Sequence, residues 1–126
     1  MRYKLLGQSG LRVSGLCLGT MTFGEAWGWG ASKKVCQEML EIYLEAGGNF
    51  VDTATNYTKG ESEIILGDLI GDRRDSLVLA TKYSLTSGES EDPNSGGNSR
   101  KNLIQTVERS LKRLKTDYID LLYLHM

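Results

Sequence analysis

Four residues with chemically useful side chains stand where apolar segments of the chain end. Asp52 lies near the end of one apolar run, and Tyr57 follows it by five positions. Lys82 ends a second run, and His125, the single histidine of the chain, ends a third. An acid, a phenol, an ammonium group and an imidazole brought together would form a cluster able to donate a proton.

The chemistry expected of this cluster centres on the phenol. An unperturbed phenol has a pKa of about 10 and is a weak acid at neutral pH, but a nearby ammonium favours the phenolate. Lys82 would supply that ammonium for Tyr57, and Asp52 would hold it by an ion pair. His125 would hydrogen-bond the bound oxygen or relay the proton. Such a cluster suits protonation of a carbonyl oxygen as hydride arrives at the carbon, and the hydride must come from a cofactor because no side chain can deliver it.

Each of these residues also has a purely structural interpretation. Asp52 could bond to a loop backbone, and Lys82 could be a solvated strand end. Tyr57 could serve packing, and a lone histidine such as His125 is often a hydrogen-bonded core residue. Their common placement at successive strand ends favours a shared site.

The apolar pattern predicts a hairpin followed by alternating strands and helices. Residues 3–6 and 11–13 are short apolar runs joined by the turn formers Gly7-Gln8-Ser9-Gly10, which predicts a β-hairpin acting as a lid or plug. The strands expected after it are residues 15–21, 49–54, 76–81 and 118–124. The helices between them are expected to start at Ser32, near Ser62 and at Ser99.

Two of the expected helices carry apolar residues at three- and four-residue spacing, the pattern of a helix with one buried face. In the first helix these residues are Val35, Met39, Ile42, Tyr43 and Ala46. In the third helix they are Leu103, Val107, Leu111 and Leu114. The polar segment of residues 84–98 precedes the third helix, and a loop of that length is more often functional than structural.

This order of elements predicts a parallel sheet covered by helices. A barrel is favoured over a doubly wound sheet because no strand is followed by a GxGxxG turn and because the polar residues stand at successive strand ends. A whole barrel takes about 250 residues. We therefore predict that residues 1–126 are the N-terminal half of an α/β (β/α)8 TIM barrel, truncated after the fourth strand and opened by a β-hairpin. The bare sheet edge of such a half predicts self-association.

The composition excludes several classes of function. With 40% hydrophobic and 25% charged residues the chain is globular, and 15 basic against 16 acidic residues give no field that attracts nucleic acid or an anionic membrane. Cys17 and Cys36 lack the spacing of a metal site or a redox CxxC pair, so we expect no metal. The N-terminus has no signal-peptide core and the chain has no run of about 18 apolar residues, which predicts a cytoplasmic protein.

A set of short segments carries a further pattern. They are Gly19-Thr20-Met21, residues 48–54 with Asn56-Tyr57, residues 60–63, residues 80–82 and residues 110–121. Their order and spacing resemble those of the aldo-keto reductase family over essentially the whole chain. The resemblance implies a TIM barrel that uses NADP(H), with a catalytic tetrad formed by Asp52, Tyr57, Lys82 and His125. It also implies contacts with the nicotinamide end of the cofactor by Gly19, Thr20, Met21 and Asp52.

The same resemblance predicts that the full-length protein is an NADP(H)-dependent oxidoreductase that reduces small aldehydes or ketones to alcohols, and that residues 1–126 alone are inactive. The alternative is a regulatory or channel-associated subunit in which the cofactor acts as a sensor. One departure from the family is Thr58, where many members carry glycine after the tyrosine. The loop of residues 93–100 is similar to that of bacterial-type members with small or unassigned carbonyl substrates.

Overall fold

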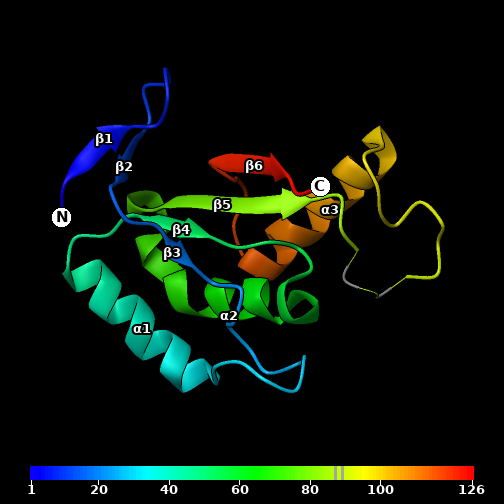
Figure 1. Cartoon of the computed structure of the whole chain (residues 1–126), viewed down its shortest axis with the longest axis horizontal. Helices are drawn as coiled ribbons and strands as arrows, with labels where there is room; N and C mark the ends of the chain where they lie inside the picture. Colours follow the sequence, from blue (N-terminus) through cyan, green and yellow to red (C-terminus); the bar gives the residue numbers. More distant parts are fainter. Residues whose placement is uncertain (87, 89) are drawn as a thin grey trace.

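The computed structural model describes residues 1–86, 88 and 90–126, with strands in two sheets and helices between them (Figure 1). The strands are β1 (Tyr3–Leu5), β2 (Arg12–Ser14), β3 (Leu18–Gly19), β4 (Phe50–Asp52), β5 (Val78–Tyr83) and β6 (Leu121–Leu124). The helices are α1 (Lys33–Glu45), α2 (Glu61–Ile70) and α3 (Arg100–Leu114), with short 3₁₀ segments at Tyr57–Gly60 and Gly71–Ser76. Two positions of the loop expected at residues 84–98 lie outside the described residues.

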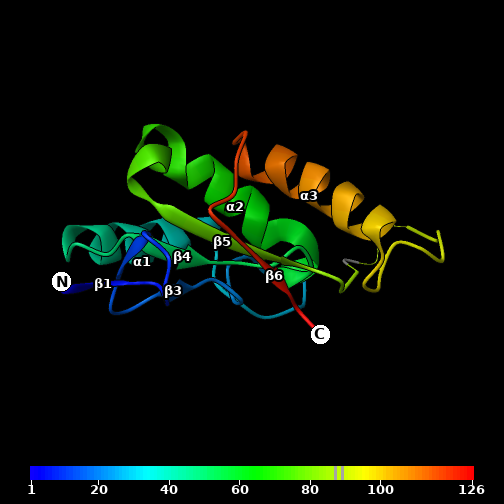
Figure 2. The ribbon, with the colours of Figure 1, turned by 90° about the horizontal axis from the view of Figure 1, so that it is seen from above.

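Four parallel strands form the main sheet in the order β3-β4-β5-β6, which is also their order in the sequence. The register pairs Gly19 with Asp52, Asp52 with Ala80 and Ala80 with Leu121. Helices α2 and α3 lie together on one side of this sheet (Figure 2). The arrangement confirms the predicted parallel alternation of strands and helices and is consistent with part of a (β/α)8 barrel.

Side chains of the central strands alternate between two apolar cores, because successive residues of a strand point to opposite faces. Val51 and Leu79 belong to the larger core, which the sheet shares with α1 and α2. Phe50 and Val78 point to the opposite face, where they pack with Val13 of the hairpin. Helices therefore cover one face of the sheet, and the hairpin covers the other face near the start of the strands.

The antiparallel hairpin β1-β2 provides this second cover. Its Val13 is 1% exposed and is part of the smaller core, so the predicted hairpin is confirmed and also contributes one core side chain. The Tyr3 hydroxyl donates a hydrogen bond to Gly47 O at 2.6 Å, which joins the hairpin to the segment after α1.

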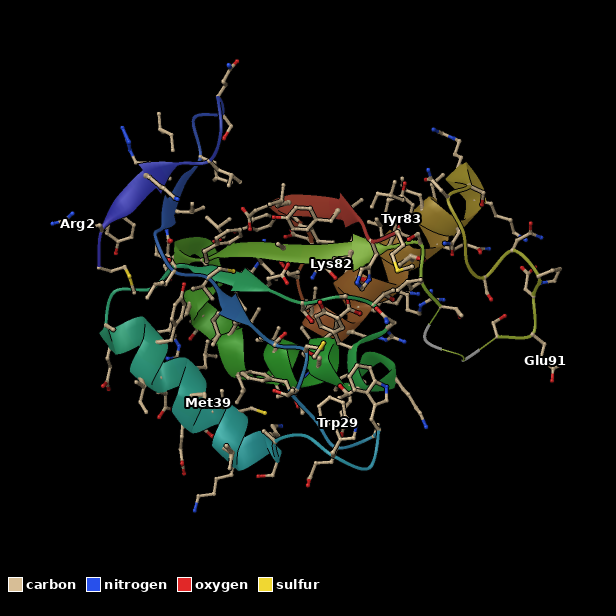
Figure 3. The ribbon with its side chains drawn as sticks, viewed as in Figure 1. Arg2, Trp29, Met39, Lys82, Tyr83 and Glu91 are labelled. Atoms are coloured by element: carbon tan, nitrogen blue, oxygen red, sulfur yellow. The ribbon has the colours of Figure 1, made fainter. Side chains whose placement is uncertain are left out.

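The buried face of α1 differs from the apolar stripe predicted for it. Cys36 and Leu40 are buried, whereas Val35, Met39 and Ile42 are 43%, 39% and 68% exposed. Figure 3 shows Met39 on the outside of the molecule. Ala46 is exposed as well, so the predicted stripe is wrong for four of its five members. Apolar side chains occupy two adjacent faces of this helix, so their spacing alone does not decide which face packs on the sheet.

Helix α3 buries a largely polar face. Ser99 caps it as predicted, because its hydroxyl accepts from the backbone N–H of Asn102 at 3.1 Å. Asn102, Thr106, Ser110 and Leu114 are the buried residues of the helix. The members of the predicted stripe that are only partly buried are Leu103, Val107 and Leu111. Small hydroxyl side chains on the inner face let α3 pack closely on α2.

Three strands are shorter than the sequence predicts, and one of them, β4, holds only Phe50–Asp52 of the expected 49–54. β3 holds only two residues of the expected 15–21, and β6 begins at 121 rather than at 118. Before β6, the Asp120 carboxylate accepts from the backbone N–H of Leu79 at 2.8 Å, so a side chain takes the place of a strand partner there. β5 extends one residue beyond Lys82.

Candidate active site

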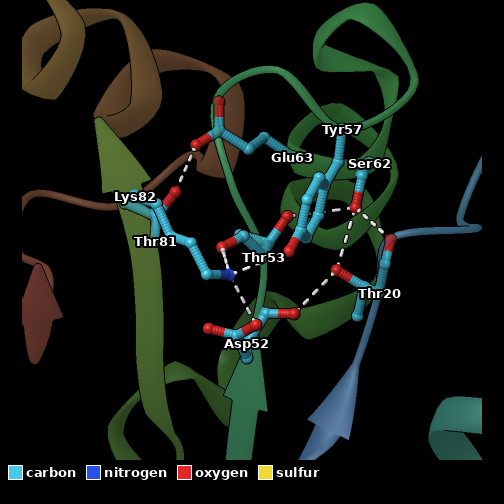
Figure 4. A network of polar contacts seen from close by, with 8 residues as sticks. All are labelled: Thr20, Asp52, Thr53, Tyr57, Ser62, Glu63, Thr81 and Lys82. Carbon is cyan, nitrogen blue, oxygen red and sulfur yellow. Dashed lines mark hydrogen bonds and ion pairs between the residues drawn. The ribbon is translucent and has the colours of Figure 1, made fainter. Parts of the chain in front are cut away.

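The register of β4 and β5 pairs Asp52 with Ala80, and Lys82 lies two residues further along β5 on the same face of the sheet. Both residues continue the alternation that points Phe50 and Val78 away from the helices, and they emerge near the carboxyl ends of their strands. Lys82 Nζ lies 2.6 Å from Asp52 Oδ2 (Figure 4). The side chains are 15% and 24% exposed, so water only partly screens this pair. The structure thus contains the ion pair expected from the sequence.

A turn after β4 returns Tyr57 to the ammonium of Lys82. The backbone N–H of Tyr57 donates to Ala54 O at 3.2 Å, and Lys82 Nζ donates to the Tyr57 hydroxyl at 3.1 Å. Lys82 also donates to Thr53 O at 2.8 Å. The three hydrogens of the ammonium therefore have acceptors in Asp52, Thr53 and Tyr57. Because the phenolic oxygen accepts from Lys82, its own hydrogen is directed toward another acceptor.

His125 follows β6 and approaches the same phenol. Its backbone N–H donates to Tyr83 O at 3.1 Å, and its ring packs edge-on against Tyr57 with centroids 5.9 Å apart at 82°. Burial lowers the pKa of the imidazole and the positive charge of Lys82 lowers it further, while Asp52 acts in the opposite direction. The imidazole is therefore neutral at pH 7, and within the described part of the chain its buried Nδ1 has no hydrogen-bond partner.

A pocket of about 480 Å³ opens beside these groups. Its lining residues are Cys17, Gly19, Phe50, Asp52, Lys82, Tyr123, Leu124 and His125. A Cβ atom at Gly19 would meet nothing within 4 Å, so the wall of the pocket is open at this point. Cys17 is an exposed residue, but partial burial of its thiol and the Asp52 carboxylate raise the pKa of that thiol to about 11 despite the opposing charge of Lys82, so the thiol is protonated at neutral pH.

Buried hydroxyl groups join the ends of β3 and β4 to the start of α2 (Figure 4). Thr20 Oγ1 donates to Asp52 O at 3.0 Å and lies 2.9 Å from Ser62 Oγ. Ser62 Oγ in turn donates to Thr20 O at 2.8 Å and lies 3.0 Å from Thr53 Oγ1. All three residues are fully buried. The network fixes the backbone that carries the Asp52 carboxylate.

The residues predicted to contact a cofactor lie at different depths. Gly19 and Asp52 line the pocket, and Met21 is 47% exposed just beyond β3. Thr20 is 0% exposed, and its hydroxyl is engaged with the backbone of Asp52. Its side chain therefore acts on the pocket through Asp52.

A buried ion pair on the helix side of the sheet was not anticipated from the sequence. Arg113 Nη1 lies 3.1 Å from Glu63 Oε2, and the Glu63 side chain is 0% exposed. Thr81 Oγ1 donates to Glu63 Oε1 at 2.7 Å, and Arg113 Nη1 donates to Thr55 O at 2.9 Å. The pair bridges α2 and α3 to the ends of β4 and β5. In the sequence Glu63 stands in the polar first turn of α2, where an acidic residue is expected to face solvent near the helix N-terminus, so the sequence gives no signal of this buried pair.

The site geometry agrees with the relationship found by comparison. Residues 15–126 match the sequence profile of the Aldo/keto reductase family. The chain belongs to this family. It is 48% identical to norsolorinic acid reductase stcV of Emericella nidulans over 94% of this chain and 33% of that protein. It is 41% identical to aryl-alcohol dehydrogenase GME11368 of Pestalotiopsis microspora over 98% of this chain and 35% of that protein.

A solved structure shows the same relationship. The holo form of aldo-keto reductase AKR11C1 from Bacillus halodurans is 33% identical to this chain and superposes on it with a TM-score of 0.82, covering 98% of this chain and 40% of that one. The chain thus spans about a third of the length of the two curated relatives named above. Family membership supports an oxidoreductase with the TIM-barrel fold. In the described part of the chain, every helix is too short or too polar to cross a lipid bilayer.

Proposed function

We propose that the full-length protein is an NADP(H)-dependent oxidoreductase that reduces aldehydes or ketones to alcohols. The observation that carries the proposal is the arrangement around Lys82, whose ammonium binds the Asp52 carboxylate at 2.6 Å and the Tyr57 hydroxyl at 3.1 Å. A phenol that accepts from an ammonium is suited to give its own proton to an oxygen in the pocket. These residues also stand at strand ends, where barrel enzymes place their catalytic groups.

The pocket fits the nicotinamide end of the proposed cofactor. Gly19 leaves space at the wall, where a Cβ would meet no neighbour within 4 Å, and Asp52 lies on the adjacent strand. Gly19 and Met21 would contact the cofactor, with Asp52 beside them. NADPH supplies a hydride when it is bound.

In this proposal Tyr57 is the general acid, and its hydroxyl protonates the carbonyl oxygen of the substrate. Lys82 stabilises the phenolate left behind, and Asp52 keeps the ammonium in place. His125 donates a hydrogen bond to the same carbonyl oxygen, a role that suits an imidazole held neutral by burial. Tyr57 and His125 thus act directly on the carbonyl oxygen, whereas Lys82 and Asp52 act through the Tyr57 hydroxyl.

We propose aromatic aldehydes and ketones as the substrate class. Two named relatives are a norsolorinic acid reductase and an aryl-alcohol dehydrogenase. Phe50 and Tyr123 are among the lining residues of the pocket, and aromatic side chains favour contact with an aromatic substrate.

The decisive experiment replaces Tyr57 by Phe in the full-length protein. We expect kcat for reduction of an aryl aldehyde with NADPH to fall on the order of 10²- to 10⁴-fold, with cofactor binding retained in a fluorescence titration. Tyr3→Phe is the matched control, because Tyr3 lies in the hairpin and is 54% exposed. An unchanged rate in Tyr57→Phe would refute the assignment. Wild-type protein that binds NADPH but turns over none of a carbonyl panel would instead support a sensor subunit.

We also propose that residues 1–126 supply the first half of the barrel, because their main sheet has four parallel strands of the eight that a (β/α)8 barrel contains. When produced alone, this half would pair with another copy through the β6 edge of its sheet. Analytical ultracentrifugation of residues 1–126 tests this, and a compact cooperative monomer would contradict it. A cytoplasmic location, with no nucleic-acid or membrane partner, completes the proposal and is testable by cell fractionation.

A further inference from the structure

Thr58, directly after Tyr57, has a backbone conformation that a β-branched residue rarely adopts. Its φ and ψ are 46° and 44°, in the left-handed region, and the residue is fully buried. Lys59 and Gly60 continue the left-handed turn with φ of 57° and 92°. A branched side chain is sterically disfavoured here, so the surrounding structure must hold it. Strain of this kind concentrates at functional sites.

The hydroxyl of Thr58 makes two hydrogen bonds that hold the residue in this left-handed conformation. It donates to Phe23 O at 2.6 Å and accepts from the backbone N–H of Ser62 at 3.0 Å. That N–H belongs to the first turn of α2, where backbone donors have no acceptor within the helix. Thr58 therefore joins three separate segments: the Tyr57 turn, the loop after β3 and the start of α2.

These bonds fix Tyr57 from its carboxyl side. On its amino side, the N–H of Tyr57 donates to Ala54 O at 3.2 Å. On the carboxyl side of Tyr57, the hydroxyl of Thr58 is hydrogen-bonded to Phe23 O and to the backbone N–H of Ser62. The phenol thus projects from a short backbone segment held at both ends, toward Lys82 Nζ at 3.1 Å.

We propose that Thr58 is a positioning residue for Tyr57: its hydroxyl holds the left-handed turn that sets the phenol against the Lys82 ammonium. The inference rests on the proposed function of Tyr57 as general acid. It explains why a threonine stands in a strained backbone conformation here: its hydroxyl places the side chain of Tyr57. Thr58 itself touches neither substrate nor cofactor in this proposal.

The test compares Thr58→Val with Thr58→Ser in the full-length protein. Valine keeps the branched shape and removes both hydrogen bonds, whereas serine keeps the hydroxyl. We expect Thr58→Val to lower kcat on the order of 10- to 100-fold with the KM for NADPH unchanged, because a small misplacement of a catalytic group costs this much. Thr58→Ser should restore kcat to within a few-fold of wild type. Equal kcat in wild type and Thr58→Val, or equal loss in both variants, would overturn the proposal.

Two further variants separate the hydroxyl from the backbone strain. Thr58→Gly relieves the strain at the same position and also removes the hydroxyl, so we expect it to lose kcat as the valine variant does. Lys59→Gly relieves the strain at the next position, where the side chain is exposed, and should keep wild-type kcat. A Thr58→Gly variant with full kcat would show that the hydroxyl does not position the phenol.

A spectroscopic measurement decides the inference even if the proposed function fails. Tyrosine is isotopically labelled at the ζ carbon, and the Tyr57 signal is assigned by its loss in Tyr57→Phe. We expect this signal to shift in Thr58→Val and to keep its wild-type position in Thr58→Ser and Lys59→Gly. An unmoved Tyr57 signal in the valine variant would refute the positioning role. If Tyr57→Phe keeps its turnover while the signal shifts in Thr58→Val, the function assigned to Tyr57 is wrong and the positioning stands.

Discussion

Lys82 and Asp52 form an ion pair of 2.6 Å that joins neighbouring strands at the carboxyl end of the sheet. The pair is partly shielded from water, and Figure 3 shows Lys82 near the end of β5. An ammonium held this way has a fixed position relative to the Tyr57 hydroxyl, 3.1 Å away. The proton-donating ability of the site thus depends on the register of two strands.

The first prediction concerns this ammonium. Lys82→Met keeps much of the side-chain length and removes the charge that stabilises the phenolate. We expect kcat of the full-length protein for an aryl aldehyde to fall on the order of 10²-fold or more. Lys33→Met is the control, since Lys33 has a side chain that is 55% exposed on α1. Steady-state kinetics showing less than a twofold change in Lys82→Met would contradict the mechanism.

The second prediction is the titration of His125. Its pKa is lowered from 6.5 by burial first and by the Lys82 charge second. A base with a lowered pKa in the folded state contributes stability that is fully present above pH 6.5 and is lost as pH falls through the folded value. We expect the imidazole signal, assigned by its loss in His125→Gln, to titrate below pH 6.5. The stability difference between wild type and this variant should shrink with acidification, and a midpoint above 6.5 would exclude the assigned environment.

The third prediction uses Cys17 as a reporter inside the pocket. Burial and the Asp52 carboxylate raise its pKa to about 11, from 9.0. Thiolate is the reactive form, so alkylation by iodoacetamide should be about tenfold slower than for a free thiol and should rise with pH beyond pH 9 without levelling off. Asp52→Asn should speed the reaction at a given pH. Labelling is located by peptide mass spectrometry, with buried Cys36 as the unreactive control. A rate that levels off below pH 9 would show that the thiol is not in this environment.

The fourth prediction concerns the buried pair of Glu63 and Arg113. Glu63→Gln removes the carboxylate charge that faces the Arg113 guanidinium on the helix side of the sheet. Breaking a buried pair from one side costs about 3–5 kcal/mol, so we expect a loss of this order in urea unfolding of the full-length protein. Lys33→Met, which breaks an exposed pair with Asp68, should cost less than about 1 kcal/mol. Similar losses in both variants would mean that the buried pair stabilises the fold no more than an exposed pair does.

The alternation of strands made much of the site predictable from the sequence. Asp52, Lys82 and His125 each end or nearly end a strand, and parallel strands bring such residues to one edge of a sheet. Two of them also share a face, because they lie at equivalent positions of the pleat. Tyr57 lies in a turn rather than on a strand, so the alternation of strands alone does not fix where its phenol points.

Other features depend on contacts that spacing does not reveal. The exposure of Ile42 follows from a choice between two apolar faces of α1, which only packing against the sheet decides. Helix α3 packs closely on α2, and its buried Thr106 donates to Asn102 Oδ1 at 3.1 Å, a local bond that apolar spacing does not reveal. The left-handed turn at Thr58 is hidden because its conformation is one that the residue type disfavours.

The last prediction tests that close approach of the two helices. A Cβ atom at Gly67 of α2 would lie 2.2 Å from the backbone oxygen of Arg113, and backbone cannot move aside as a flexible side chain can. Gly67→Ala should therefore destabilise the full-length protein by about 1–3 kcal/mol through overpacking. Gly10→Ala is the control, because a Cβ there would meet nothing within 4 Å. Urea unfolding measures both variants. Equal stability of the two would mean that α2 and α3 can separate at no cost, and the ion pair of Glu63 and Arg113 would then have to tolerate a wider spacing.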